Sequence, residues 1–416
     1  AMALGSASAA SGLRSTAIGV YSNAAAQDSV AIGNGPAAAS GARVGTGATS
    51  SVAIGTNASV GTNATTALAV GASSSATAVD ASAVGRSNQA SGVDSSAIGN
   101  SNQASGVEGS AIGFGNVASG QRSAAIGYGS DATATDSTSV GSHTTASGIG
   151  SSAFGNQSFA QGAYSTSLGA FNFAEGQDSS AVGYGNTAYG LRSSAFGRYN
   201  YARGEESVAI GNYAEARGQS SLAIGTGMLM ADEYGGLVNS EMSAIAYGGN
   251  SIAIGNAALA FGDGSTTFGN YSMAFAQGGI AMGNQNFAGS MIYDEETDEI
   301  TFTGINALAV GTGNGAYGDS SIAMGLFNKA YGETSLALGL NNLADVEDAI
   351  AIGVGNEALE EDAVAIGSGN LAGANDSSAI GVRNEATGED SSAIGFDNIA
   401  SGIDSSAIGH QGVASG

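Results

Sequence analysis

The sequence predicts an all-β fold, a parallel β-solenoid (β-roll) built from 14-residue coils. The first observation is a glycine that recurs every 14 residues from Gly71 to Gly225, and again in phase from Gly311 to Gly409. The second is that this glycine usually ends an Ala-apolar-Gly triplet, with a second Ala-x-Gly triplet seven residues later. A short fixed period means that one structural unit is stacked many times, so the repeat determines the fold. We therefore expect one continuous array of about 27 coils over residues 1–416.

Each coil is predicted to consist of two strands and two turns. In residues 95–108 the triplets 97–99 and 104–106 lie seven residues apart. In a helix the two glycines would cost about 2 kcal/mol per repeat, and the leucine pattern of a coiled coil is missing. The alternation in 208–210, Val-Ala-Ile, fits a short strand in which Val and Ile point to one side and Ala to the other.

The two alanine columns are expected inside a thin, flat roll. A position that admits only a methyl group indicates close approach of two layers. The middle residue of the first triplet is Ile, Val, Leu, Phe or Met, so it is apolar yet points away from the alanines. The middle residue of the second triplet is mixed, as in Ser105, Gln161 and Arg203, and we expect that column to face water.

The apolar column on the outside needs a cover. A single roll with this stripe exposed along its length would aggregate, and a closed cyclic homo-oligomer sharing the stripe as a core avoids this. Three-fold symmetry suits a wedge with one apolar face, although the pattern alone does not distinguish three copies from two. The residues assigned to this shared trimer core are Ile98, Ile112, Ile126, Phe154, Leu168, Ile210, Ile254, Ile352 and Ile394.

The composition narrows the class of protein. With 69 Gly but only one Pro the chain is not collagen, and its 43% of apolar residues fall at fixed places, unlike those of a flexible linker. The formal charge of −25 should repel nucleic acid and anionic membranes. Cysteine is absent, and no apolar run approaches the roughly 18 residues of a membrane span. Because the chain opens and stops in phase with its repeat, we interpret it as a fragment of a longer protein.

The repeat is interrupted near 226–249, near 290–303 and, less regularly, near 34–70. The first two segments are predicted to be hairpin-like insertions, and the third a local bulge or loop. Two interpretations are open. The insertions are projecting loops that form a ligand platform, or each is a tolerated hairpin that packs on a neighbouring subunit, which is the interpretation we favour. Their candidate binding residues are Tyr234, Tyr293, Asp294, Glu295 and Glu296.

Aromatic residues are frequent between 154 and 213, and Tyr189, Tyr199 and Tyr201 fall at positions expected on the outside or edge of the coils. Exposed aromatics are favoured binding anchors. The alternative is that they widen the oligomer core or cover coil edges.

One five-residue motif recurs along the chain: Ser-Val-Ala-Ile-Gly occurs at 29–33, 51–55 and 207–211, and Ser-Ile-Ala-Ile-Gly at 251–255. These motifs resemble the heads of trimeric autotransporter adhesins, the YadA-like family of type V secretion. The resemblance covers nearly the whole chain. It implies a left-handed parallel β-roll, a homotrimer, and display on a Gram-negative cell surface through an outer-membrane anchor that lies beyond this sequence. It also implies adhesion to extracellular-matrix proteins, host receptors or other surfaces, and a role in virulence.

Catalysis has no support in the sequence, so we expect no enzyme, no cofactor and no metal. The two histidines, His143 and His410, lie in distant coils without a carboxylate or nucleophile pattern. A column of turn carboxylates that includes Asp348, Asp362 and Asp376 is interpreted as structural, with a low-affinity calcium ladder as the alternative. The leading hypothesis is an adhesin head. The alternative is a structural spacer or self-association module that binds copies on other cells and drives autoagglutination and biofilm formation.

Overall fold

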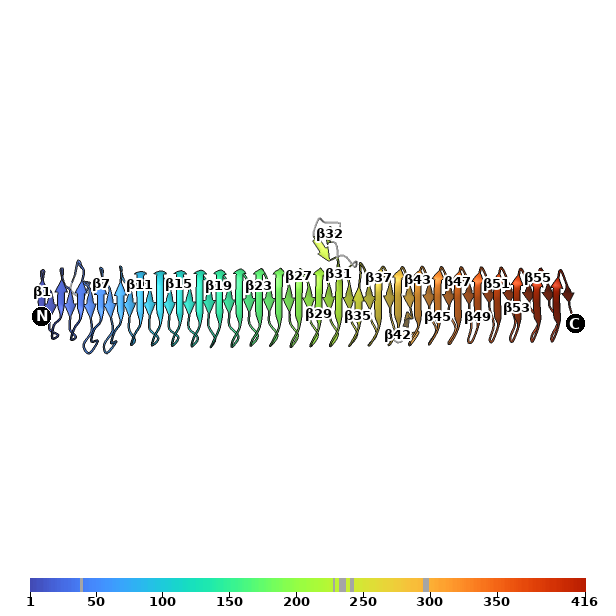
Figure 1. The fold of residues 1–416 in the computed structure, drawn as a ribbon, viewed down its shortest axis with the longest axis horizontal. Helices are drawn as coiled ribbons and strands as arrows, with labels where there is room; N and C mark the ends of the chain where they lie inside the picture. The colour runs from blue at the N-terminus through green and yellow to red at the C-terminus, as the bar shows by residue number, and fades with distance from the viewer. Residues whose placement is uncertain (38–39, 227–228, 232–236, 240–242, 295–298) are drawn as a thin grey trace. The chain divides into compact units, whose positions relative to one another are not determined.

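The structure is a computed structural model that describes all residues except 38–39, 227–228, 232–236, 240–242 and 295–298. It divides into two compact units, unit 1 (Ala1–Phe196) and unit 2 (Gly197–Gly416). The described residues form strands and turns without a helix. In each unit every regular coil contributes one longer strand to one parallel sheet and one two-residue strand to a second parallel sheet (Figure 1). We call these the long-strand sheet and the short-strand sheet.

The long strands of unit 1 are β1 (Met2–Leu4), β3 (Thr16–Ile18), β5 (Val30–Ile32), β7 (Val52–Ile54), β9 (Leu68–Val70), β11 (Ser82–Arg86), β13 (Ser96–Asn100), β15 (Ser110–Phe114), β17 (Ala124–Tyr128), β19 (Thr138–Ser142), β21 (Ser152–Asn156), β23 (Thr166–Ala170) and β25 (Ser180–Tyr184). Its short strands are β2 (Ala9–Ala10), β4 (Asn23–Ala24), β6 (Arg43–Val44), β8 (Ser59–Val60), β10 (Ser75–Ala76), β12 (Gln89–Ala90), β14 (Gln103–Ala104), β16 (Val117–Ala118), β18 (Asp131–Ala132), β20 (Thr145–Ala146), β22 (Phe159–Ala160), β24 (Phe173–Ala174) and β26 (Thr187–Ala188). The division between the units falls within β27 (Ser194–Arg198).

The long strands of unit 2 are β29 (Val208–Asn212), β31 (Leu222–Thr226), β35 (Ile252–Ile254), β37 (Thr266–Asn270), β39 (Ile280–Asn284), β43 (Leu308–Thr312), β45 (Ile322–Leu326), β47 (Leu336–Leu340), β49 (Ile350–Val354), β51 (Val364–Ser368), β53 (Ser378–Val382), β55 (Ser392–Phe396) and β57 (Ser406–His410). Its short strands are β28 (Tyr201–Ala202), β30 (Glu215–Ala216), β34 (Ile245–Ala246), β36 (Leu259–Ala260), β38 (Met273–Ala274), β40 (Phe287–Ala288), β44 (Gly315–Ala316), β46 (Lys329–Ala330), β48 (Leu343–Ala344), β50 (Glu357–Ala358), β52 (Leu371–Ala372), β54 (Glu385–Ala386), β56 (Ile399–Ala400) and β58 (Val413–Ala414).

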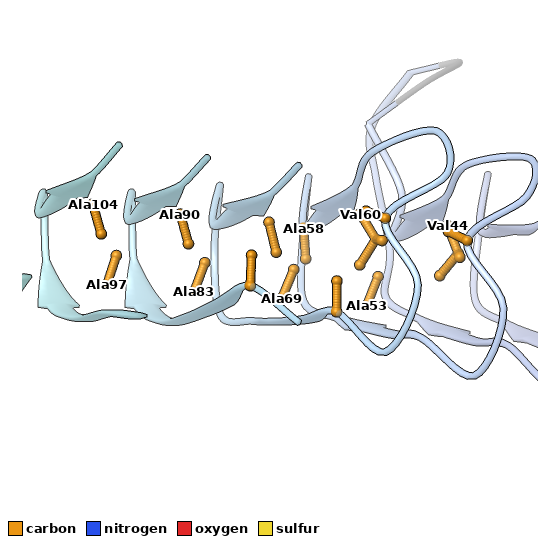
Figure 2. Packing of buried hydrophobic residues seen from close by; sticks show 14 of the residues in the cluster. Val44, Ala53, Ala58, Val60, Ala69, Ala83, Ala90, Ala97 and Ala104 are labelled. Atoms are coloured by element: carbon orange, nitrogen blue, oxygen red, sulfur yellow. The ribbon is translucent and has the colours of Figure 1, made fainter. Parts of the chain in front are cut away.

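The register is one coil per rung, which confirms the parallel solenoid of 14-residue coils. In β13 and β15, Ala97 pairs with Ala111 and Ile98 with Ile112. Inside the roll the alanines of the two sheets face each other, as Ala97 and Ala104 do in Figure 2. Both are fully buried, which confirms that the interior admits little more than a methyl group.

The recurring glycine is required by backbone geometry. Gly99 has φ of 119°, and a Cβ on it would overlap the carbonyl oxygen of Gly113 in the next coil. L residues rarely adopt this conformation, so the position is restricted to glycine. The 14-residue glycine period therefore marks a point in each coil where the stacked backbones leave no room for a side chain. The second-triplet glycines mark another, since a Cβ on Gly106 would overlap the carbonyl oxygen of Gly120.

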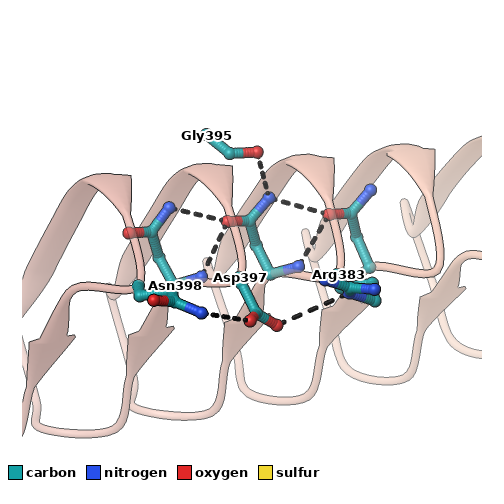
Figure 3. Close-up of polar contacts among 7 residues, drawn as sticks. Arg383, Gly395, Asp397 and Asn398 are labelled. Atoms are coloured by element: carbon teal, nitrogen blue, oxygen red, sulfur yellow. Dashed lines mark hydrogen bonds and ion pairs between the residues drawn. The ribbon is translucent and has the colours of Figure 1, made fainter.

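The asparagine column is a buried hydrogen-bond ladder. The Asn398 side-chain amide donates to Asn384 Oδ1 at 2.9 Å, and its backbone N–H donates to the same oxygen at 3.1 Å (Figure 3). The amide also donates to the Gly409 carbonyl at 2.8 Å. The same pattern repeats through Asn342, Asn356 and Asn370. Because a buried amide without partners is costly, the ladder is structural.

The irregular stretch near 34–70 consists of enlarged coils. Strand β6 pairs with β8, and β8 with β10, at offsets of 16 residues instead of 14. The wider interior is filled by Val44 and Val60, only 1% and 3% exposed, where the regular coils place alanine. Two further buried residues, Ala48 and Ala64, complete these coils. Figure 2 shows the larger loops beside Val44 and Val60.

Both insertions in unit 2 contain hairpins, as predicted. β32 (Leu229–Ala231) pairs antiparallel with β33 (Leu237–Asn239), and β41 (Ser290–Asp294) pairs antiparallel with β42 (Glu299–Thr303). The first follows β31 of the long-strand sheet and the second follows β40 of the short-strand sheet. In Figure 1 β32 stands away from the coils, whereas β42 lies beside them.

Candidate functional site: an aromatic face on unit 2

The outward side chains of the short-strand sheet change character within unit 2. In unit 1 the residue after the buried alanine is polar in coil after coil, for example Ser105, Ser119 and Thr133. In unit 2 the same column contains Tyr247, Phe261, Phe275, Tyr317 and Tyr331. The expected polar outer face is therefore correct for much of unit 1 and wrong for this part of unit 2. These side chains do not contact the interior of the roll, so the packing of the repeat does not determine which residue type occupies the column.

We define the aromatic face as the outward surface formed by Ile245, Tyr247, Leu259, Phe261, Met273, Phe275, Phe287, Met291 and Phe302. Its rings are stacked along the sheet. The ring centroids of Tyr247 and Phe261 are 4.6 Å apart with an interplanar angle of 9°, and those of Phe261 and Phe275 are 5.4 Å apart at 7°. Parallel stacking follows because successive coils are separated by one strand spacing of about 4.8 Å. The ladder is pre-organised, which reduces the entropy lost when a partner binds.

Two grooves run along this face. One has a volume of about 420 Å³ and is lined by Tyr247, Phe261, Phe275 and Met291 among others. The second, of about 470 Å³, is lined by Met273, Phe287, Tyr317 and the turn residues Tyr271 and Phe327. Both volumes are in the range of small-ligand and side-chain pockets. Burial raises the pKa of the Tyr317 hydroxyl.

The hairpin β41–β42 belongs to the same surface. Phe302 of the hairpin stacks on Phe261 of the sheet with 6.5 Å between ring centroids, and Met291 lines the groove beside Phe275. The outward residues Ile292, Tyr293 and Ile300 are 53–54% exposed. The hairpin therefore extends the aromatic face while it packs on the coils of its own chain.

The face ends in a cluster of arginine and tyrosine around a buried carboxylate. Glu215, whose side chain is 6% exposed, forms ion pairs of 2.8 Å with both Arg203 and Arg217. The Arg217 guanidinium lies 4.5 Å from the ring centroid of Tyr247, and that of Arg203 lies 5.5 Å from the ring centroid of Tyr201. The hydrogen bond to Glu215 raises the pKa of Arg217. Both guanidinium planes are thereby fixed beside the aromatic rings.

The predicted tyrosines differ in their exposure and in their contacts. Tyr189 is 50% exposed in unit 1. Tyr199 and Tyr201 are half-buried in unit 2, where Tyr199 stacks on the buried Tyr213 at 5.1 Å. Burial raises the pKa of Tyr213. Tyr199 thus covers a coil edge, and Tyr201 lies at the arginine end of the aromatic face.

Of the binding residues predicted in the two insertions, only Tyr293 has a described side chain, and it is 54% exposed. The side chain of Asp294, and the residues Tyr234, Glu295 and Glu296, lie outside the described residues. Their role in binding remains a prediction.

The predicted trimer-core residues all lie on the outward side of the long-strand sheet. In the single chain Ile98, Ile112, Ile126, Phe154 and Leu168 are 36–47% exposed. Ile210, Ile254, Ile352 and Ile394 are half-buried. These partly exposed apolar side chains form the stripe that a second subunit would have to bury. The shared trimer core itself remains a prediction.

The described residues contain no group of three or more His, Cys, Asp or Glu side chains that could hold a metal ion. The two histidines take part in aromatic ladders: His143 lies edge-on to Tyr128, and His410 stacks on Phe396, each at 5.0 Å between centroids. Several turn carboxylates contact the preceding coil, as in Arg122–Asp136 at 2.6 Å and Arg383–Asp397 at 3.5 Å. Within the described part of the chain no helix is long and apolar enough to span a membrane.

Sequence reasoning missed the aromatic face because it assigned the whole second-triplet column to water from examples such as Ser105, Gln161 and Arg203. The signal was available: the same column contains an aromatic residue at Tyr247, Phe261 and Phe275. It missed the role of Glu215 because a single acidic residue in a mixed column carries no signal before the neighbouring arginines are placed.

A search of the curated proteins gives no significant match. A family model does match, that of the YadA head domain repeat. It covers residues 1–22, 10–35, 90–116, 118–144, 146–172, 174–200, 202–227, 246–272, 303–328, 316–342, 330–356, 347–370, 358–384, 372–398 and 386–411. The intervening segments contain the enlarged coils and the hairpins. With a repeat of this family matched over more than half of its length and a parallel solenoid of 14-residue coils, the chain belongs to the YadA head family.

Proposed function

We propose that this chain is the head of a trimeric autotransporter adhesin, displayed on the outer surface of a bacterium, and that it attaches to a host extracellular-matrix protein or surface receptor through the aromatic face of unit 2. The family supports the adhesin class. The observation that carries the contact surface is the stacked ladder Tyr247–Phe261–Phe275 beside two grooves.

The composition of this face favours a protein partner. Tyr and Arg are enriched among residues that dominate binding energy, and the grooves offer concave sites for apolar side chains. With a net charge of −25, the chain as a whole disfavours a strongly acidic partner. A matrix protein or receptor segment that presents apolar and basic side chains fits both features.

The first test screens the purified chain against collagen, fibronectin, laminin and bare plastic, after light scattering has established its oligomeric state. Saturable binding to one matrix protein is the expected result. Binding only to itself would instead support a self-association module that drives autoagglutination and biofilm formation. Binding to nothing would support a structural spacer.

The second test uses the variant Tyr247→Ser/Phe261→Ser, because unit 1 carries serine at the same column without loss of fold. We expect the dissociation constant for the matrix protein to rise by about tenfold or more. The matched control is Tyr128→Ser, an aromatic residue of unit 1 that is 51% exposed on the long-strand sheet. Equal affinity of the double variant and the control would overturn the assignment of the aromatic face.

A further inference from the structure

The enlarged coils of unit 1 form a polar groove of about 420 Å³ on the short-strand sheet. Gly45 and Gly61 lie along it, and Arg43, Thr46, Ser59 and Thr62 supply its polar side chains. The groove exists because each enlarged coil adds residues to the turn after its short strand. This stretch lies between residues 35 and 90, outside the segments that the family repeat matches, so it distinguishes this chain from a regular head.

The electrostatics of this groove differ from those of the rest of the protein. No Asp or Glu occurs between Asp28 and Asp80, in a chain that carries 35 acidic residues. Arg43 is exposed and makes no ion pair with any residue that the structure describes. By contrast, Arg14 and Arg122 each pair with a carboxylate one coil away. A guanidinium without a partner in an acid-free surface attracts an anion and can hold a carboxylate or sulfate in bidentate geometry.

The groove walls are lined by hydroxyl groups, which restricts the kind of ligand that would fit beside an anion at Arg43. The hydroxyls of Thr46 and Thr62 are exposed and form no hydrogen bond within the described residues. Ser59 Oγ donates to Ser75 Oγ at 3.1 Å and keeps its acceptor capacity. The two valines beside the groove point into the roll and are 1% and 3% exposed, so the walls offer little apolar surface. Neighbouring hydroxyls that both donate and accept hydrogen bonds match the hydroxyls of a sugar ring better than the side chains of a peptide.

From these features we propose that the groove binds an acidic saccharide that carries one carboxylate or sulfate, with the anion at Arg43 and the sugar hydroxyls at Thr46, Ser59 and Thr62. The volume suits one or two sugar rings and exceeds that of an isolated anion. A long polyanion is disfavoured because the rest of the chain is strongly acidic. The groove shares no residue with the aromatic face, and the two proposals stand or fall independently.

The experiment titrates the full chain with glucuronic acid and N-acetylneuraminic acid, which carry a carboxylate, with N-acetylglucosamine 6-sulfate, and with neutral N-acetylglucosamine, by ligand-observed NMR and calorimetry. Saturable binding of an acidic sugar, weakened by salt, with the neutral sugar bound at least about tenfold more weakly, is the expected result. The carboxylated and sulfated probes decide which anion the site prefers. Equal binding of the neutral sugar, or no binding of any acidic probe, would overturn the proposal.

The variant Arg43→Gln tests the anion contact, because glutamine occupies the same column at Gln89 and Gln103 without disturbing the strand. We expect the substitution to raise the dissociation constant of the acidic sugar by about tenfold to a hundredfold, which is the range for loss of a charge-assisted pair. The matched control is Arg86→Gln in β11, another exposed arginine without an ion pair among the described residues. Identical losses in the two variants would show a diffuse charge effect and overturn the site. The variant Tyr247→Ser/Phe261→Ser should bind the acidic sugar as the parent does, whether or not its affinity for the matrix protein falls.

Discussion

At the scale of single residues, the fold depends on where a side chain has no room. Gly99 combines φ of 119° with a neighbouring carbonyl oxygen, whereas Gly115 has φ of 65° and no atom within 4 Å of the point where a Cβ would stand. The column of Gly115 also accepts Ser101, His143 and Gln157 at positive φ. Two glycines of similar appearance in the sequence therefore have different roles.

We predict that Gly99→Ala destabilises the fold by about 3 kcal/mol or more, because strain and overlap add. Gly115→Ala should cost only about 1 kcal/mol, since the conformation is unfavourable but unobstructed. Thermal and urea unfolding of the two variants measure the difference. Equal destabilisation would contradict the role assigned to the close approach at Gly99.

The ion pair Arg14–Asp28, at 2.5 Å, gives a pH prediction at the same scale. The hydrogen bonds that the Asp28 carboxylate accepts lower the pKa of Asp28 to about 2, and the hydrogen bond from Arg14 is the largest cause. A depressed carboxyl pKa contributes stability that is present above the unfolded-state value near 4 and is lost as the pH falls toward 2. NMR titration of the folded chain should give Asp28 a pKa of about 2. The variant Arg14→Gln should raise the pKa of Asp28. An unchanged pKa in the variant would show that the pair is not formed in solution.

At the scale of the element, the hairpin β41–β42 is a removable addition. Phe287 of β40 pairs with Gly315 of β44 at an offset of 28 residues, so deletion of the 14 residues 290–303 restores the regular step. We expect the deletion variant to fold with nearly the parental melting temperature.

The same deletion should weaken binding of the matrix protein by about tenfold or more, because it removes Phe302 and Met291 from the aromatic face. Surface plasmon resonance with the deletion variant beside the parent measures this. Stronger binding after the deletion would mean that the hairpin covers the face instead of extending it.

The elements also show how far the sequence can be read. The alanine columns and the glycine period were predictable because each coil must satisfy the same packing and the same backbone hydrogen bonds. The aromatic face was not predicted because Tyr247 and Phe261 contact no interior atom, and the repeat does not constrain them. The filling of the enlarged coils by Val44 and Val60 was also missed, since a wider interior becomes evident only when the 16-residue register is known.

At the scale of the whole molecule, we propose that the outward apolar column of the long-strand sheet forms the contact between subunits. Ile98, Ile112 and Ile126 lie on neighbouring strands β13, β15 and β17 and are 36–40% exposed in the single chain. Side chains of this size buried by association would each contribute on the order of 1–2 kcal/mol per copy. A closed homotrimer that shares them is the assembly we propose.

Replacement of Ile98, Ile112 and Ile126 by serine should therefore shift the chain toward smaller species in light scattering and lower its melting temperature. The control is Val93→Ser/Val107→Ser, which changes turn residues that are 41% exposed. A trimer that survives the isoleucine substitutions unchanged would place the subunit contact elsewhere.

The enlarged coils have a further consequence for how the chain finds its native pairing. Regular coils are interchangeable in their interiors, so a strand displaced by one full repeat would meet almost the same alanines, asparagines and glycines. Such slipped states compete closely in energy with the native one during folding. The side chains of Val44 and Val60 fit the wider interior of the enlarged coils. If the strands slipped by one repeat, a valine would have to occupy a position in a regular coil that has room only for alanine. In unit 1 the irregular stretch thus acts as a register mark that an ideal repeat would lack.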